Sequence, residues 1–279
     1  MRILVTGRGS GGSWQIRGEQ LGKAIGATVD PGGASLKGYD LAIAVKRPRA
    51  DLLQRLRDAK VRIVWDVVDA WPQPAGNDWG KPECIDWLRR EVDAIKPAAI
   101  VASTKVMATD CEQFSMPVLY LPHHARPGQR PNEIRESVQI VGYQGGDYLG
   151  HWQQKLEREC SRRKWSFIVD RSKTADMQLA DVDIAVAFRH QDGYAAKNWK
   201  SNVKLANAQG SGTPSVVGRY AGYLETANGR QYFADDELGL AAAFEALQYV
   251  EARREQVEKY HPPTLKEVAK DYRAWLHRL

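Results

Sequence analysis

Three lysines cluster around the start of a helix predicted over residues 201–209. Lys197 and Lys200 precede it, and Lys204 lies in its first turn. The amino end of a helix carries partial positive charge and unbonded N–H groups, so lysines there favour a negatively charged ligand. The spacing predicts a phosphate or diphosphate site. The alternative is that these are solvated charges on a helix face.

A glycine-rich loop follows the first predicted strand, Ile3–Val5. Gly7, Gly9 and Gly12 match the pattern GxGxxG, and Asp30 follows at the distance typical of nicotinamide-dinucleotide sites. The pattern raises the alternative of an NAD(P)-dependent oxidoreductase. Glycines also allow backbone N–H groups to approach any anion, or simply form a tight turn.

The rest of the chain weakens the oxidoreductase hypothesis. No Tyr-x-x-x-Lys pair is present; the nearest match, Tyr194 with Lys197, has the wrong spacing. We therefore expect the loop to form one wall of a cleft between two α/β domains. Gly9, Gly11 and Gly12 are then candidate ligand-binding residues.

Acidic and aromatic residues follow the strand predicted over 61–65. Asp66 and Asp69 are three positions apart, and Trp71 comes next. Doubly wound sheets bind ligands at the carboxyl ends of their strands. The two carboxylates are candidate catalytic groups, and Trp71 is a candidate stacking surface for a sugar or a base. Asp66 as a helix or turn cap and Trp71 as a core residue are the alternatives.

Two adjacent histidines, His123 and His124, lie where the first domain is predicted to end. A neutral imidazole can act as a base or bind a diphosphate. His123 is a candidate catalytic residue and His124 a candidate acceptor-site residue, with a structural or surface role as the alternative. Asp181 and Asp183 have the letters of a DxD motif but head a predicted buried strand, so no metal site is expected.

Short apolar runs alternate with amphipathic stretches, which is typical of parallel sheets with crossover helices. Strands are predicted at 3–5, 41–45, 61–65, 99–102, 118–121, 138–141, 166–169, 182–186 and 214–217. Helices are predicted at 15–25, 51–59, 84–95, 105–114, 151–162, 201–209 and 238–259, and a last one begins after Thr264.

A segment rich in Pro, Gly and Arg, residues 122–131, interrupts this alternation and is typical of an interdomain linker. The expected domains are residues 1–125 and 126–262, both Rossmann-like. Residues 263–279 are expected to form a helix that packs back on the first domain.

The 279 residues carry 40 Lys and Arg against 34 Asp and Glu, a mild positive excess that permits an anionic partner. Three separated cysteines suggest neither a disulfide framework nor a zinc site. No apolar run approaches the roughly 18 residues of a membrane span. We expect a cytoplasmic monomer, in the host cytoplasm if the chain is phage-encoded.

The second half of the chain resembles the donor-binding cassette of GT-B glycosyltransferases. Ala180–Val182 resembles the opening "aDv" of that cassette, residues 204–208 its "LLEA" helix, Gly212–Val217 its "GtPvV" and residues 222–225 its trailing "gG..E". The segments 121–125 and 140–143 are similar to its hinge and to its "ivyvG" strand. The resemblance implies a GT-B fold of two doubly wound domains facing a central cleft.

The resemblance implies transfer of a sugar from a nucleotide sugar, with UDP favoured, and no tightly bound cofactor. The candidate donor-binding residues are then Gly9, Gly11 and Gly12 in the first domain and Arg189, Lys200, Lys204, Asn207, Gly212, Thr213 and Glu225 in the second. The paired glutamates of the family fall on Trp199 and Asn207, so neither is kept, and Tyr143 replaces the usual arginine. These losses leave a non-catalytic binding protein as an alternative.

The sequence does not name the acceptor, which is a glycan, a small molecule or DNA. Trp14, Trp71 and His124 are the candidate acceptor residues. The basic stretches 46–49 and 158–164, in a chain with 9 tryptophans, would suit a phosphate backbone and an extruded base. A phage-type enzyme that modifies hydroxymethylated DNA bases is therefore one hypothesis, and ordinary surface charge is its alternative.

Overall fold

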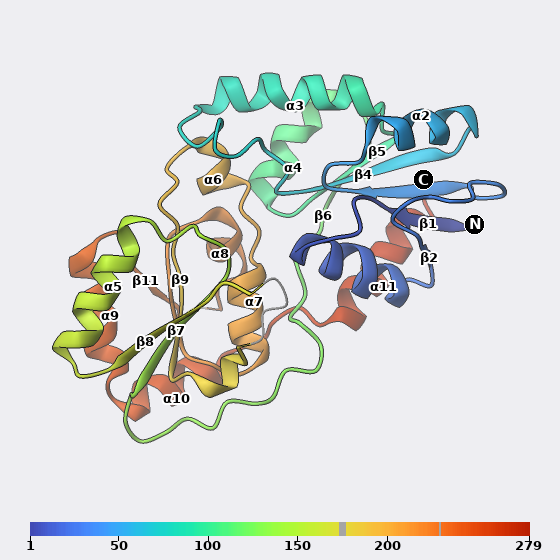
Figure 1. Ribbon diagram of the computed structural model, residues 1–279. Coiled ribbons are helices and arrows are strands. Elements are labelled where there is room, and N and C mark those ends of the chain that lie inside the picture. Colours follow the sequence, from blue (N-terminus) through green and yellow to red (C-terminus); the bar gives the residue numbers. More distant parts are fainter. Residues whose placement is uncertain (173–176, 229) are drawn as a thin grey trace. The chain divides into compact units, whose positions relative to one another are not determined.

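The computed structural model describes residues 1–172, 177–228 and 230–279 (Figure 1). The chain divides into two compact units, each an α/β fold around its own parallel sheet. Unit 1 comprises residues 1–123, 192–201 and 264–279, and unit 2 comprises residues 124–191 and 202–263.

The sheet of unit 1 has six strands in the order β2-β1-β3-β4-β5-β6, and all the pairings are parallel. Its strands are β1 (Ile3–Thr6), β2 (Thr28–Val29), β3 (Leu41–Val45), β4 (Arg62–Val68), β5 (Ala99–Ala102) and β6 (Val118–Tyr120). Strands β1, β3 and β5 are buried at every position, as expected for a parallel sheet covered on both faces.

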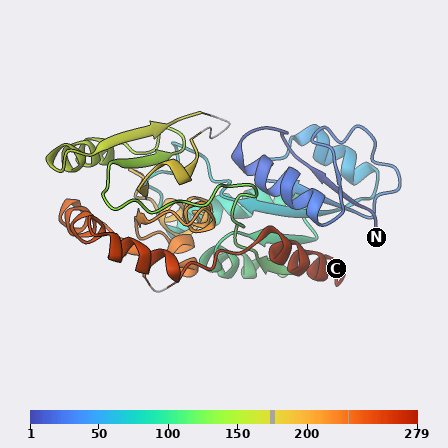
Figure 2. The same ribbon diagram turned by 90° about the horizontal axis from the view of Figure 1, so that it is seen from below.

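Helices cover both faces of this sheet. One face packs against α2 (Ala50–Asp58), α3 (Lys81–Ile95), α4 (Lys105–Cys111) and α6 (Tyr194–Asn198). The other packs against a π-helical segment (Trp14–Gln20), α1 (Leu21–Ala24) and the terminal helix α11 (Leu265–Leu276). A short 3-10 turn (Glu112–Phe114) follows α4. Figure 2 shows α11 in dark red beside the chain's first residues in blue.

The sheet of unit 2 has five parallel strands in the order β11-β10-β9-β7-β8. These are β7 (Ile140–Gln144), β8 (Ser166–Asp170), β9 (Ile184–Ala187), β10 (Ser215–Val217) and β11 (Tyr232–Phe233). Helices α5 (His151–Arg162) and α9 (Glu237–Leu247) share a core with one face. The other face packs against α7 (Val203–Gly210), α8 (Ala221–Thr226) and the 3-10 turn Leu179–Asp181.

In each sheet, the direction in which the chain adds successive strands reverses once. In unit 1 the chain goes from β1 to β2 on one side and then to β3 on the other; in unit 2 it goes from β7 to β8 and then to β9. The crevices at the carboxyl ends of β1/β3 and of β7/β9 are therefore topological switch points, where open α/β sheets bind ligands.

Most predicted elements are confirmed, and β3, β5 and α5 have the predicted bounds. Two helix predictions were wrong in detail. The helix expected over 238–259 is two helices, because the chain turns at Gln248 and Tyr249 before α10 (Val250–Glu258). The helix expected over 15–25 begins as a π-helix, in which the ring of Trp14 packs against Gly18.

Two segments from the second half of the chain lie with unit 1. Residues 192–201 join it through α6, whose Ala195 and Ala196 enter its core together with Trp199. Helix α11 begins with a capping box between Thr264 and Glu267. Its Val268, Tyr272 and Leu276 pack against the face of the unit 1 sheet opposite to α6.

Candidate functional site

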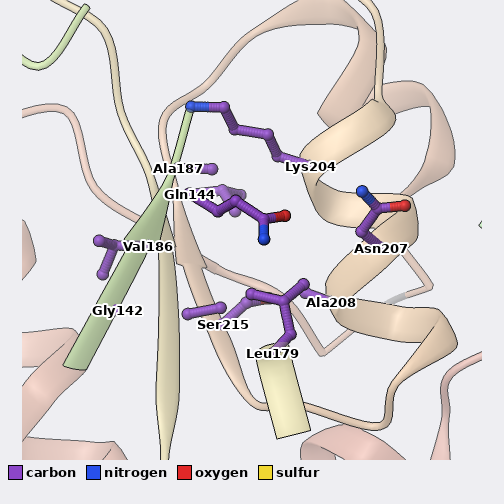
Figure 3. Close-up of a pocket in the computed structure, with 11 residues that line it drawn as sticks. Gly142, Gln144, Leu179, Val186, Ala187, Lys204, Asn207, Ala208 and Ser215 are labelled. Atoms are coloured by element: carbon purple, nitrogen blue, oxygen red, sulfur yellow. The ribbon is translucent and has the colours of Figure 1, made fainter. Parts of the chain in front are cut away.

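Unit 2 contains a cavity between helix α7 and the strands β7, β9 and β10, and Gln144 brings its lining to the carboxyl end of β7 (Figure 3). Its lining is Gly142, Gln144, Leu179, Ala185, Val186, Ala187, Lys204, Asn207, Ala208, Ser215 and Val217. Lys204, Gln144 and Asn207 supply the charged and amide groups. The other side chains are small or apolar.

Lys204, in the first turn of α7, is held against the end of β7. Its Nζ lies 3.7 Å from the ring centroid of Tyr143, a cation–π contact. Burial raises the pKa of Tyr143, so the ring is a neutral phenol, and its hydroxyl donates to the Gly146 carbonyl at 3.2 Å. Tyr143 stands where the resembled GT-B cassette has an arginine. Its contact with Lys204 places a lysine cation at the carboxyl edge of β7 instead.

The loop after β7 depends on glycine at residue 145. A Cβ there would lie 2.5 Å from Lys204 Nζ, and the backbone has φ +151°. Any larger residue would displace the ammonium group. The carboxyl edge of β7 is therefore shaped around this lysine.

The cavity itself is narrow, with about 20 Å³ of space, enough for a single water molecule. Asn207 Oδ1 accepts a hydrogen bond from the Arg126 amide at 3.0 Å, and Gln144 Nε2 donates to the Met177 carbonyl at 2.7 Å. These two hydrogen bonds attach the chain at Arg126 to helix α7 and the chain at Met177 to the end of β7. A larger ligand must extend beyond this cavity.

An adjoining cavity of about 110 Å³ shares Gln144 and Leu179 with the first. Its other lining residues are Arg126, Pro127, Gly128, Gln129, Met177 and Gln178. The amide Nε2 and Oε1 atoms of Gln129 are both buried, and neither has a hydrogen-bond partner among the described residues. Such an amide is costly to bury, and it offers an NH2 donor group and a carbonyl acceptor to a ligand.

The other predicted donor residues of unit 2 have different surroundings. Arg189 follows β9, and its guanidinium lies 4.4 Å from the ring centroid of Tyr148. Glu225 is half-buried on α8. Gly212 (φ +65°) and Thr213 form the turn before β10, at the amino edge of the sheet, where Thr213 Oγ1 donates to the Leu179 carbonyl at 2.9 Å.

In unit 1, Asp69 lies just beyond β4 and forms two ion pairs. Lys46 Nζ is 2.7 Å from Oδ1, and Lys200 Nζ is 2.7 Å from Oδ2. Burial alone would raise the pKa of Asp69, but the two lysines outweigh it and hold the pKa well below its usual range. Lys200, predicted to bind a diphosphate, is thus engaged with a carboxylate of unit 1.

Asp66 lies within β4 and is fully enclosed. Arg17 Nε is 3.6 Å from Asp66 Oδ2, and both side chains are shielded from solvent. Burial raises the pKa of Asp66, and Arg17 offsets only part of that effect. The hydroxyl of Tyr272 on α11 is also buried, with no hydrogen-bond partner in the described chain. Asp66, Arg17 and Tyr272 are therefore three polar side chains buried together in the core of unit 1.

The backbone between these two carboxylates is strained. Val68 has φ 57°, and the register between β4 and β5 shifts between Asp66 and Val68. A β-branched residue rarely adopts this conformation, and such strain clusters at functional sites. The shift turns the chain at the carboxyl end of β4, directly before Asp69.

His123, His124, Trp71 and Trp14 are all buried, at 4% exposure or less. His123 is the last residue of the first segment of unit 1, and His124 is the first of unit 2.

Trp71 lies in the core of unit 1, and its carbonyl accepts a hydrogen bond from Arg47. Trp14 Nε1 donates to Glu19 at 3.1 Å and its ring lines a cavity. Neither tryptophan offers an exposed stacking face.

The glycine-rich loop is an irregular turn between β1 and the π-helix. Gly9 has φ +74°, and a Cβ there would lie 2.7 Å from the Pro31 Cβ. Gly11 has φ +81° and, like Gly12, faces open space. Asp30, the residue that would bind a ribose in the oxidoreductase hypothesis, instead accepts hydrogen bonds from the amides of residues 32, 33 and 34.

The basic stretches considered for DNA are largely paired within the chain. Arg49 pairs with Asp51, Arg158 with Glu237, and Arg162 and Arg163 with Glu159. Among the described residues there is no cluster of three or more His, Cys, Asp or Glu side chains suited to a metal ion. Nor does the described chain contain a helix long and apolar enough to span a membrane.

Sequence reasoning missed Gln129 and Gln144. Both are ordinary polar residues in type and spacing, and only the chain path brings them to one crevice. The glycines at 145 and 146, which follow a predicted strand, were the one available signal for this loop.

No protein-family model and no curated protein matches this sequence. Solved structures do match. Anabaena HepE, solved in complex with UDP and glucose, is similar with a TM-score of 0.63 and 12% identity, over 100% of both chains. A trehalose-phosphate synthase (UDP-forming) from Burkholderia vietnamiensis gives 0.61 and 10% identity, over 100% of both chains.

Sucrose-phosphate synthase from Thermosynechococcus elongatus is similar with a TM-score of 0.60 and 12% identity, over 100% of this chain and 98% of that one. At such identities the likeness concerns the path of the chain. The protein therefore has the α/β fold of the GT-B glycosyltransferases, as its second-half sequence pattern implied.

Proposed function

We propose that the protein is a glycosyltransferase that takes its sugar from a nucleoside diphosphate sugar bound by unit 2. The observation that carries this proposal is the position of Lys204, whose ammonium group lies over Tyr143 at the carboxyl edge of β7. The GT-B fold of the chain supports it, as does the UDP named for two of its structural neighbours.

Transfer from such a donor releases a nucleoside diphosphate, and the developing charge on that leaving group must be stabilised. In our proposal Lys204 supplies this charge, together with the N–H group of Gly146; the Gly145 N–H already donates to the Asp170 carbonyl at 2.9 Å. Arg189, which follows β9 at the same edge, is the second cation. No metal ion is needed for this role.

The adjoining cavity is the proposed base site. Uracil presents an N–H donor flanked by carbonyl acceptors, and an amide side chain can pair with both kinds of group. Gln129 has its amide buried there and engaged by no described residue. A uridine nucleotide would satisfy this amide, so we propose UDP-sugars as the donors.

Unit 1 is the proposed acceptor-binding part. A base acting on the acceptor hydroxyl should have a pKa near the working pH. Asp69 is a weak proton acceptor because its two lysines lower its pKa, and Asp66 is paired with Arg17. We therefore assign positioning roles to both and keep His123 as the candidate base. His123→Asn should lower kcat more than it changes the KM for the donor.

The test is a panel of UDP- and GDP-sugars, each assayed for release of the nucleoside diphosphate. We expect slow hydrolysis of at least one UDP-sugar, and UDP but not NAD should raise the Tm. Stabilisation by NAD alone would identify an oxidoreductase. UDP binding without turnover of any donor, with or without acceptors, would identify a non-catalytic binding protein.

A hydroxymethylated DNA base is the more specific acceptor suggested by the sequence. The test is glucose transfer to hydroxymethylated duplex DNA, with unmodified duplex as the control. Binding that falls steeply with salt would support a phosphate-backbone contact. Absence of both transfer and binding would rule out this acceptor.

A further inference from the structure

Three loops of unit 2 line a groove of about 440 Å³. They are the segment that leads into β7, the turn between α5 and β8, and the break between α9 and α10. The lining residues are Glu136, Ser137, Val138, Arg163, Trp165, Gln248 and Tyr249. Because two of the loops lead into strands, the groove lies at the amino edge of the sheet, at the other end of β7 from Gln144. It is therefore separate from the two cavities of the proposed donor site.

One buried arginine joins two walls of this groove. Arg253 on α10 is 1% exposed. In the helix break, its guanidinium donates to the Leu247 carbonyl at 2.7 Å and to the Gln248 carbonyl at 3.0 Å. It also donates to the carbonyls of Arg135, at 2.5 Å, and Glu136, at 3.2 Å. Walls that are fixed in this way before a ligand arrives lower the entropy cost of binding.

The third wall is held by Arg163. Its guanidinium pairs with Glu159, donates to the Ala241 carbonyl at 3.1 Å and lies 5.6 Å from the ring centroid of Trp165. The Arg163 side chain is 9% exposed, and its Nε has no hydrogen-bond partner among the described residues. A buried N–H group is costly to leave unbonded, so an oxygen atom of a ligand in the groove would stabilise it.

The charges in the lining are balanced within unit 2. Glu136 lies 2.6 Å from Arg254, and Arg163 is paired with Glu159. The groove therefore presents no excess charge of either sign, which favours a neutral ligand over a phosphate or a cation.

The rest of the lining combines aromatic rings with small polar groups. Tyr249 is 59% exposed, and Trp165 is half-buried. Gln248 Nε2 donates to Glu245 at 2.6 Å, which leaves the amide oxygen of Gln248 as an acceptor, and the hydroxyl of Ser137 both donates and accepts. Rings of this kind supply rigid contact area at a low entropy cost.

We infer that this groove binds a neutral oligosaccharide, so that unit 2 carries a carbohydrate site in addition to the proposed donor site. A pyranose ring has an apolar C–H face, which packs on an aromatic ring, and a rim of hydroxyl groups that donate and accept hydrogen bonds. Its volume of about 440 Å³ lies within the range of about 300–1,000 Å³ that is typical of small-molecule sites. The inference goes beyond the proposed transfer reaction and does not depend on it.

The experiment is binding of the full chain to an array of neutral, acidic and sulfated oligosaccharides, followed by calorimetry with the neutral glycan that binds most tightly. At least one neutral oligosaccharide should bind. Tyr249→Ala should weaken its binding about tenfold, because the variant loses an aromatic ring that packs on the sugar. Tyr249→Phe keeps the ring and should bind within about twofold of wild type.

Leu238→Ala is the matched control, because Leu238 is an exposed apolar residue on the same helix α9 that leads into the break, but it lies outside the groove. It should leave the glycan affinity unchanged. The inference is overturned if no neutral oligosaccharide binds, or if Tyr249→Ala binds the glycan as tightly as wild type. It is also overturned if acidic or sulfated glycans bind more tightly than every neutral one.

These outcomes are separate from those of the proposed donor site. Lys204→Met should bind the glycan like wild type, and saturating UDP should not displace it. Displacement by UDP would assign the glycan to the donor cavity and overturn the inference. If UDP does not bind to the wild-type chain, the proposed function fails, and the glycan titration still tests the groove.

Discussion

Lys200 Nζ lies 2.7 Å from Asp69 Oδ2, and both side chains are about nine-tenths shielded from solvent. Lys46 holds the other carboxylate oxygen, also at 2.7 Å. One carboxylate thus joins three segments of unit 1: the ends of β3 and β4 and the segment that follows α6. A buried pair of this kind is costly to break from one side.

Asp69→Asn should lower the free energy of unfolding of unit 1 by about 3–5 kcal/mol at pH 7, because it leaves two lysines without their counter-charge. The pKa of Asp69 is lowered in the folded chain. Its stabilisation is therefore complete above the ordinary pKa of about 3.9 and is lost as the pH falls through the folded value.

Urea unfolding at pH 7, 5 and 3, followed by tryptophan fluorescence, measures this effect. The difference between wild type and Asp69→Asn should be equal at pH 7 and 5 and smaller at pH 3. Asp192→Asn is the control, since its pair with Lys197 is exposed and should contribute less than about 1 kcal/mol. An equal loss of unfolding free energy in the two variants would show that the buried pair stabilises the fold no more than the exposed one.

Tyr272→Phe should leave stability unchanged or raise it by up to about 1 kcal/mol, because it removes a buried hydroxyl that has no partner among the described residues. Tyr272→Ala should cost about 3–5 kcal/mol through loss of packing between α11 and the sheet. Both are measured by urea unfolding. A marked loss in Tyr272→Phe would mean that the hydroxyl bonds to the Asp66–Arg17 pair.

Gln129→Leu should separate binding from stability. It removes a buried amide without a described partner, so the free protein should be at least as stable as wild type. The affinity for UDP should fall about tenfold, because the uracil then loses a hydrogen-bonding partner in a buried site. Calorimetry with UDP and thermal unfolding without it give the two quantities.

Gln153→Leu is the control for this variant, since Gln153 bonds to Glu157 on the exposed face of α5. It should leave UDP affinity unchanged. Unaltered UDP affinity in Gln129→Leu would exclude the adjoining cavity as the base site.

The fold was largely predictable because local patterns and packing agree in most elements. Short apolar runs such as Leu41–Val45 and Ala99–Ala102 are typical of buried parallel strands, and both have the predicted bounds. The break at Gln248 and Tyr249 was not predictable in this way, since neither residue is a glycine or a proline.

The candidate site was predictable only in part. Lys204 was identified from its place in the first turn of a helix, a local property. Lys200 has the same local signal, but α6 packs its segment into the core of unit 1, where Asp69 lies. Gln129 has no local signal at all, and its importance comes from the burial of an amide beside a cavity.

The donor site proposed around Lys204 is tested most directly by the affinity of UDP for wild type, Lys204→Met and Lys155→Met. Lys155 is the matched control, because it also lies over an aromatic ring in unit 2, 4.9 Å from the centroid of Trp152, but on α5 outside the cavity. We predict that Lys204→Met weakens UDP binding at least tenfold, as loss of one charge-assisted contact to a diphosphate should, and that Lys155→Met does not. Equal UDP affinity in all three proteins would contradict the proposed donor site.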